Sequence, residues 1–367
     1  MPLHLTTSTA NPVADPSSPV FRDRGEDWEG KFSIPTSAIP PGTAEVMLDC
    51  SLTGRTNPRG GILQREGSRY SITLNIPRQW RGSYTFYASP ERIEHPQQGA
   101  DHRQWWLAVM SRALRPANQS GPWWPLNSRR SVFETATPDA PPQRWVPGVP
   151  PHHQSANLEI QKRRLAGKER TLWCRRISPD PHAPVVVVFD GAEFTQMGLF
   201  EHLHHLPEPP AAVLAIDAMD TETRTKDLRF GALFRDEVLR LCEEFSSGPV
   251  IPMGASYGGL AATYWALSRP DRVREAVALS ASFWAEDDSN RRAWELAAES
   301  AGPGQRIVLD VGTLEPMLTE AHHEAAPHLQ ARGIHVVRRS FVGGHDWIVW
   351  RDRLIEGLEL LQLARAS

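Results

Sequence analysis

The chain has 367 residues, of which 40% are hydrophobic, enough for about two domains that each bury a core of their own. Its 40 lysines and arginines against 43 aspartates and glutamates leave a formal net charge of −3, which favours neither nucleic acid nor a membrane surface as a partner. Because no apolar run reaches the ~20 residues of a bilayer-spanning helix and the N-terminus does not read as a secretory signal, we expect a cytoplasmic protein.

The N-terminal third predicts a small all-β domain. Residues 1–24 are rich in Pro, Ser, Thr and Asp, so we expect a disordered tail outside the fold. Within residues 31–89, apolar and polar side chains alternate with period two, as from Tyr70 to Ile76, and Pro- and Gly-rich turns separate the runs. This pattern is typical of an immunoglobulin-like antiparallel sandwich over residues 25–128. A Pro- and Trp-rich stretch without sustained periodicity, residues 129–157, predicts an irregular connector.

Residues 158–367 predict an α/β domain with a mainly parallel sheet, because apolar strands there alternate with helical stretches. The expected strands are 170–177, 183–190, 211–217, 250–254, 276–281, 306–312 and 335–342. The expected helices are 193–206, 233–246, 257–268, 290–300, 317–332 and 347–364.

One short string in this domain predicts a nucleophile. Residues 254–259 read GASYGG, a G-x-S-x-G sequence between an apolar strand and an obvious helix. A sharp strand-to-helix turn would project the hydroxyl of Ser256, and small flanking glycines relieve the crowding that such a turn creates. Pro252 is unexpected inside this strand, because proline removes a donor from the sheet ladder.

A serine nucleophile needs a base and an acid, which in this arrangement follow later in the chain. Glu315 lies in the loop after strand 306–312, and His345 lies in the loop after strand 335–342. The order Ser, acid, His predicts a triad of Ser256, Glu315 and His345. Asp310 and Asp346 are rival acids, although Asp310 lies within its strand and Asp346 is adjacent to the histidine.

An oxyanion hole should combine two backbone amides near the serine. The first belongs to Tyr257, directly after the nucleophile, and the second to the loop after strand 183–190, where Ala192 is the best candidate.

These residues resemble the enterochelin esterase family, within the esterase D-like branch of the α/β-hydrolases. The resemblance is carried by VFDG at 188–191, by AIDAMDT at 215–221 with Arg224 and Leu228, by the Gly-to-Met loop at 312–317, by GGHD at 343–346 with Trp350 and Arg351, and by WRGSY at 80–84. It spans residues 25–365. Ala255 and Tyr257 depart from the residues that the best-known members carry at the serine turn, and Pro252 is unusual.

The resemblance implies an esterase that opens the ester bonds of a catecholate trilactone siderophore such as enterobactin, so that iron is released in the cytoplasm. It also implies that the iron is part of the substrate and that the protein needs no cofactor or metal site of its own. The ferric triscatecholate carries a charge of −3, so a site that binds it should present cations and aromatic faces.

Four side chains are candidates for binding this substrate. Arg224 matches a family arginine beside the active site, and a structural salt bridge with Asp227 or Asp220 is an alternative role that could coexist with substrate binding. Three tryptophans follow strand ends near the same edge, and core packing is the alternative for each: Trp284, Trp347 and Trp350.

Two other functions stay open at this stage. Neighbouring branches of this fold process other acyl groups, so the chain could be an esterase or acyltransferase for a different ester. Alternatively, a non-catalytic protein that binds siderophores or carbohydrates would keep the triad as a vestige. The sequence leaves the oligomeric state undetermined.

Overall fold

The computed structural model describes most of the chain. The described residues are 18–53, 59–93, 100–114, 123–127, 130–142, 157–202 and 209–366.

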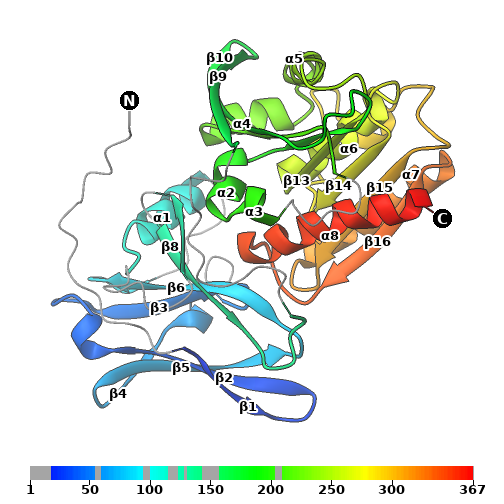
Figure 1. Cartoon of the computed structure of the whole chain (residues 1–367). Helices are drawn as coiled ribbons and strands as arrows, with labels where there is room; N and C mark the ends of the chain where they lie inside the picture. Colours follow the sequence, from blue (N-terminus) through cyan, green and yellow to red (C-terminus); the bar gives the residue numbers. More distant parts are fainter. Residues whose placement is uncertain are drawn as a thin grey trace. The chain divides into compact units, whose positions relative to one another are not determined.

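The chain divides into two compact units. The first comprises Met1–Pro142 together with Val342–Ile348, and the second comprises Gln143–Phe341 together with Val349–Ser367 (Figure 1). The short segment Val342–Ile348, which carries His345, therefore groups with the N-terminal unit although it follows the last strand of the other.

The first unit contains two antiparallel sheets of four strands. One sheet has the order β1-β2-β5-β4, with β1 Val20–Asp23, β2 Asp27–Pro35, β5 Arg69–Pro77 and β4 Gln64–Glu66. The other has the order β3-β6-β8-β7, with β3 Glu45–Cys50, β6 Arg81–Ser89, β8 Arg130–Ala136 and β7 Trp123–Asn127. Its short helices are η1 Thr36–Ala38, η2 Arg59–Gly61 and α1 Ala100–Met110.

Aromatic side chains join the inner faces of these two sheets. The ring of Phe32 on β2 lies 5.3 Å from the ring of Tyr84 on β6, and Tyr84 also stacks on Phe133 of β8 at 5.2 Å. All three side chains are buried, and burying one large apolar side chain contributes about 1.5–3 kcal/mol. The predicted all-β sandwich is therefore confirmed.

Two expectations for this unit are wrong. Val20–Asp23, placed in the disordered tail, forms β1 and pairs with β2, and Arg130–Ala136, placed in the irregular connector, forms β8 and pairs with β6. Three of the four β1 residues are exposed, so backbone pairing at the edge of the sheet forms this strand with little burial of side chains. Its sequence therefore has no apolar pattern from which the strand could be predicted. Residues 1–17 and 143–156 lie outside the described residues.

The second unit is built on one sheet of eight strands. Its order is β16-β15-β14-β13-β11-β12-β10-β9, with β9 Glu159–Leu165, β10 Lys168–Arg176, β11 Val185–Val188, β12 Ala212–Ile216, β13 Val250–Ala255, β14 Glu275–Leu279, β15 Arg306–Gly312 and β16 His335–Phe341. The neighbours from β16 to β12 pair in parallel, whereas β10 pairs antiparallel with both β12 and β9. The predicted α/β fold with a mainly parallel sheet is confirmed.

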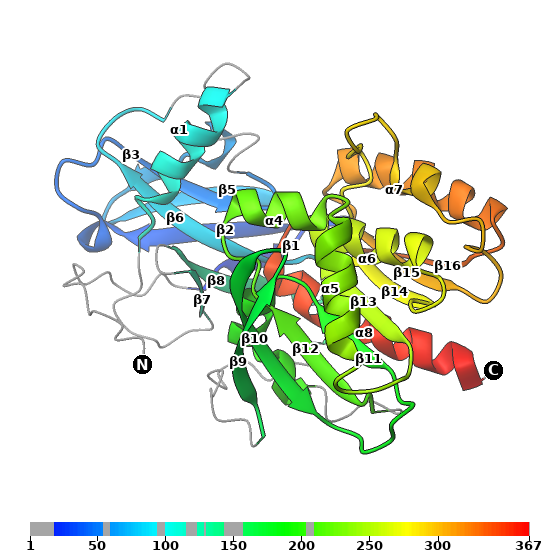
Figure 2. The ribbon, with the colours of Figure 1, turned by 90° about the horizontal axis from the view of Figure 1, so that it is seen from above.

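Helices connect these strands and cover the sheet. They are α2 Gly191–Gln196, α3 Leu199–His202, α4 Thr221–Leu228, α5 Ala232–Cys242, α6 Tyr257–Ser268, η4 Ala293–Leu296, α7 Pro316–Ala331 and α8 Trp347–Ala366. Figure 2 shows α7 and α8 on opposite sides of the β15 and β16 end of the sheet. Within the described residues, no helix is both long and apolar enough to cross a membrane.

In the second unit, one predicted helix is much shorter than expected, and the helix α4 was not predicted. Of the helix expected at 290–300, only the single turn η4 forms. The backbone is extended at Ala297, and the Ala298 amide donates to the Leu267 carbonyl oxygen at 2.9 Å. A tertiary hydrogen bond thus replaces the helical one. Conversely, α4 lies in a stretch read as a loop, and the Asp220 carboxylate starts it by accepting from the Thr223 amide at 2.8 Å.

Pro252 fits inside β13 because the strand pairs with only one neighbour at this position. It pairs in register with Val187 of β11, but the pairing of β13 with β14 begins only at Met253. The strand therefore tolerates a missing donor at that position.

Candidate active site

The predicted turn at Ser256 is present between β13 and α6. Ser256 has φ 59° and ψ −121°, a backbone conformation that costs energy for a residue with a side chain. A Cβ on Gly254 would lie 2.9 Å from the Gly258 backbone, and one on Gly259 would lie 3.0 Å from the Leu279 carbonyl oxygen. Both positions accept only glycine without movement, so the glycines of the motif allow the tight approach of strand and helix.

The segment after β14 holds this turn in place. The Ser256 amide donates to the Leu279 carbonyl oxygen at 2.9 Å, and the Ser282 amide donates to the Ser256 carbonyl oxygen at 3.1 Å. The hydroxyl oxygens of Ser256 and Ser282 lie 3.4 Å apart. Sequence reasoning did not identify Ser282, because nothing in its local pattern distinguishes it from a surface serine.

Glu315 is a buried carboxylate held at the amino end of α7. Its Oε2 accepts from the Gly312 amide at 2.8 Å and from the Ser280 hydroxyl at 2.6 Å, and the residue is only 6% exposed. Ser280 belongs to the same segment as Ser282, which contacts the nucleophile. One short segment therefore contacts both Ser256 and the predicted acid.

Trp350 does not line an open surface. It is 3% exposed, and its indole N–H donates to the Ser280 hydroxyl oxygen at 3.0 Å, while that hydroxyl donates to Glu315. The ring of Trp350 is enclosed by protein, which favours the alternative of core packing over substrate binding for this residue. Its place is behind the acid, where it completes a chain of hydrogen bonds.

The two rival acids have other partners. Asp310 is fully buried and its Oδ2 accepts from the Arg353 Nε at 2.7 Å. Asp346 caps α8, because its Oδ1 accepts from the Ile348 amide at 3.0 Å, and its Oδ2 accepts from the Ser83 amide at 2.5 Å. Glu315 stays the predicted triad acid.

The segment that carries His345 is bound by the WRGSY string of the first unit. The Arg81 amide donates to the Val342 carbonyl oxygen at 3.3 Å, and the Ser83 amide donates to Asp346. A Cβ on Gly344 would lie 2.6 Å from the Ser51 Cβ, so this glycine is required for the close approach. His345 itself is exposed, and its contact with Ser256 and Glu315 stays a prediction.

Replacing Asp346 by alanine should destabilise this segment. The variant loses a helix cap, worth about 0.5–2 kcal/mol, and leaves the buried Ser83 amide without its acceptor, worth about 1–3 kcal/mol. We expect the free energy of unfolding in urea to fall by about 2 kcal/mol or more, and less for Asp346→Asn, which keeps an acceptor. An alanine variant as stable as the native protein would contradict this role.

The loop after β11, which holds the second oxyanion candidate, is shaped by Asp190 and Gly191. Asp190 has φ 55°, and a Cβ on Gly191 would lie 2.4 Å from the Ala215 backbone. Ala192 is the second residue of α2, and Tyr257 is the first residue of α6, so neither amide has a partner within its own helix. Both remain the predicted oxyanion donors.

Arg224 pairs with a carboxylate that the sequence analysis did not consider. Its Nε and Nη2 donate to the two oxygens of Asp190 at 2.5 and 2.7 Å. The partners proposed from sequence are engaged elsewhere, because Asp227 pairs with Arg170 and Asp220 caps α4. The structural salt bridge is therefore present, but with Asp190.

Arg224 also belongs to a row of side chains that could receive a ligand. Its guanidinium carbon lies 5.9 Å from the centroid of the Tyr257 ring, and that ring lies 6.0 Å from the ring of Trp284. Trp284 is 43% exposed, which is unusual for a large aromatic side chain in a folded domain. Trp347 is half-buried and belongs to the other unit.

Glu193 is an additional titratable group beside this loop. Burial, and then the charge of Asp190, raise the pKa of its carboxyl group from about 4.5 to about 7. Because the folded state holds this proton more tightly than the unfolded state, stability should fall as pH rises from about 4.5 to about 7 and level off above it.

The variant Glu193→Gln tests this linkage. Each unit of pKa shift corresponds to about 1.4 kcal/mol, so the difference in unfolding free energy between native protein and variant should change by that order across this pH range. Chemical denaturation at a series of pH values measures it. Parallel stability curves for the two proteins would show that Glu193 is not shifted.

Comparisons with known proteins give a consistent result for both parts of the chain. Residues 43–146 match the family model "Enterochelin esterase, N-terminal", and residues 175–361 match the model "Putative esterase". An iron(III) enterobactin esterase from Dickeya dadantii is 30% identical over 338 aligned residues, covering 79% of this chain and 76% of that protein. This chain belongs to the iron(III) enterobactin esterase family.

Other members extend the comparison. The iron(III) enterobactin esterase of Escherichia coli K12 is 28% identical, covering 78% of this chain and 77% of that protein. The enterobactin esterase of Shigella flexneri, crystallised in the presence of enterobactin, superimposes with a TM-score of 0.73 at 24% identity over 95% of this chain and 96% of that one. This likeness confirms the α/β-hydrolase fold preceded by a β domain.

Proposed function

We propose that this chain is a serine esterase that hydrolyses the ester bonds of a catecholate trilactone siderophore such as enterobactin and so releases its iron in the cytoplasm. The observation that carries the proposal is the 30% identity to an iron(III) enterobactin esterase across both units. The strained turn at Ser256, between β13 and α6, supports the proposal that this serine is the nucleophile. In this proposal the iron is part of the substrate.

The proposed reaction uses the predicted triad. The Ser256 oxygen attacks a lactone carbonyl carbon while His345 accepts the hydroxyl proton, and the amides of Tyr257 and Ala192 stabilise the negative oxygen that develops. The carbon–oxygen bond to the leaving serine unit then breaks, and His345 returns the proton to that oxygen. Water, activated by the same imidazole, cleaves the acyl-enzyme and restores the Ser256 hydroxyl. Glu315 orients the ring and stabilises its positive charge.

Substrate recognition would rest on the row formed by Arg224, Tyr257 and Trp284. Catechol rings can stack on the exposed face of Trp284, and the anionic oxygens of a triscatecholate complex favour the guanidinium of Arg224. Arg224 keeps 22% of its side chain exposed despite its pair with Asp190, so it can contact a ligand without losing that partner.

Product analysis tests this proposal. The native protein should convert ferric and iron-free enterobactin into linear trimer, dimer and monomer that separate by liquid chromatography, whereas Ser256→Ala should leave the trilactone intact. Cleavage of simple aryl esters together with an untouched trilactone would favour an esterase for another acyl group. Binding of the siderophore without any cleavage would favour a non-catalytic binding protein.

A further inference from the structure

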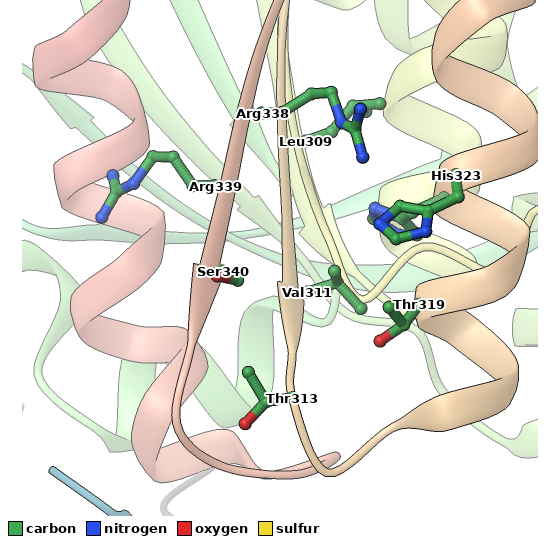
Figure 3. Close-up of a pocket in the computed structure, with 9 residues that line it drawn as sticks. Leu309, Val311, Thr313, Thr319, His323, Arg338, Arg339 and Ser340 are labelled. Atoms are coloured by element: carbon green, nitrogen blue, oxygen red, sulfur yellow. The ribbon is translucent and has the colours of Figure 1, made fainter. Parts of the chain in front are cut away.

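A cavity of about 400 Å³ lies within the second unit, and none of its lining residues belongs to the Ser256 turn. It opens between α7 and the β15 and β16 end of the sheet (Figure 3). Leu309 and Val311 of β15 form an apolar floor, and Thr319, His322 and His323 of α7 line the opposite wall. The volume is in the range of cavities that bind small ligands.

The charge in this cavity comes from Arg338. Side chains on β16 alternate, so Arg339 points towards α8, where it pairs with Glu356, while Arg338 points into the space facing His323 (Figure 3). Arg338 is exposed and has no ion pair with a described residue, and none of the nine residues that line the cavity is acidic. An uncompensated cation in a concave site favours an anion.

His322 is a neutral side chain in the same wall. Its Nε2 accepts from the Ala281 amide at 2.8 Å, so the ring must carry its proton on Nδ1. Burial lowers the pKa of His322 to about 3, so the ring stays neutral at physiological pH. The side chain is 3% exposed and lines the cavity, so its ring is held in place and adds no charge to the wall.

We propose that this cavity is a binding site for the oxyanion group of a small ligand, with Arg338 as the charged contact and His323 and Thr319 as hydrogen-bonding partners. The shared chemistry is a phosphate or carboxylate head group. The apolar floor of Leu309 and Val311 leaves space for an apolar body next to that head group. The proposal is independent of the esterase reaction, because no lining residue belongs to the predicted triad or to the Arg224 row.

Calorimetric titration of the full chain with two probes tests the proposal and distinguishes a phosphate ligand from a carboxylate ligand. Inorganic phosphate represents a free oxyanion, and benzoate represents an aromatic carboxylate. Saturable binding of either probe, weakened about tenfold or more by Arg338→Gln, supports the site, because a charge-assisted hydrogen bond contributes about one tenfold step or more in affinity. Stronger binding of benzoate than of phosphate would indicate that the apolar part of the ligand contacts the floor formed by Leu309 and Val311.

Matched variants keep the result interpretable. Arg332→Gln removes an equal charge at the end of α7 outside the cavity and should leave binding within about twofold, while Arg338→Lys should retain part of it. Thermal unfolding checks that each variant is folded. Binding of neither probe, or equal losses in Arg332→Gln and Arg338→Gln, would overturn the proposal. Binding that survives in Arg338→Gln but disappears in Arg224→Gln belongs to the candidate active site and would also overturn it.

Discussion

Ser256→Ala is expected to lower the turnover number for trilactone hydrolysis on the order of a millionfold, with little change in the affinity for substrate. The variant lacks the atom that forms the acyl-enzyme, so only positioning and oxyanion stabilisation remain. Product formation under saturating substrate measures the loss. Fluorescence titration with iron-free enterobactin measures the affinity separately.

The neighbouring hydroxyl provides a matched control. The Ser282 hydroxyl oxygen lies 3.4 Å from that of Ser256, so Ser282 is the rival nucleophile that the described contacts of Ser256 suggest. Ser282→Ala should lose less than about tenfold, because one weak hydrogen bond contributes about 0.5–1.5 kcal/mol. If Ser256→Ala stayed within tenfold of the native rate while Ser282→Ala lost activity, the nucleophile would be assigned wrongly.

Glu315→Gln should have the second largest effect, a loss of about 10⁴-fold in turnover number. The amide keeps the size of the side chain and one oxygen that can still accept from Ser280 and Gly312, so the local fold should survive. It cannot stabilise a positively charged imidazole or hold the required tautomer, which is the reason for a loss of this size in serine hydrolases.

Asp310→Asn separates this role from a structural one. Asp310 neutralises Arg353 inside the protein, so its replacement should lower the free energy of unfolding but leave the turnover of the folded protein nearly unchanged. The opposite pattern, with catalysis sensitive to Asp310 and insensitive to Glu315, would contradict the assignment of the acid. Urea denaturation of both variants provides the comparison.

Features that depend on local pattern could be predicted from the sequence. All seven strands expected in the second unit occur within two residues of their predicted positions, and apolar runs bounded by loops mark the buried parallel strands among them. The helix predicted from residue 257 to 268 is α6 itself, and the turn before it contains the strained Ser256. Strands and helices with an apolar pattern of their own can therefore be predicted without a structure.

Features that depend on contacts between distant residues could not be predicted. The edge strand β1 is held by backbone pairing, and Arg224 of α4 pairs with Asp190 only because the fold brings α4 next to the loop after β11. The hydroxyl of Ser280 links Trp350 to Glu315 across 70 and 35 residues of sequence, respectively. The role of the WRGSY string also depends on such a contact, because its Ser83 amide donates to Asp346, the residue after His345.

Active-site labelling tests the central assignment most directly. The native protein should react with a fluorophosphonate to give one covalent adduct, which peptide mass spectrometry places on Ser256, and the reaction should slow greatly in His345→Ala and in Glu315→Gln. These three results together require one hydroxyl activated by that imidazole and that carboxylate. An adduct on another residue, or unchanged labelling of Ser256 when His345 is replaced, would contradict the account.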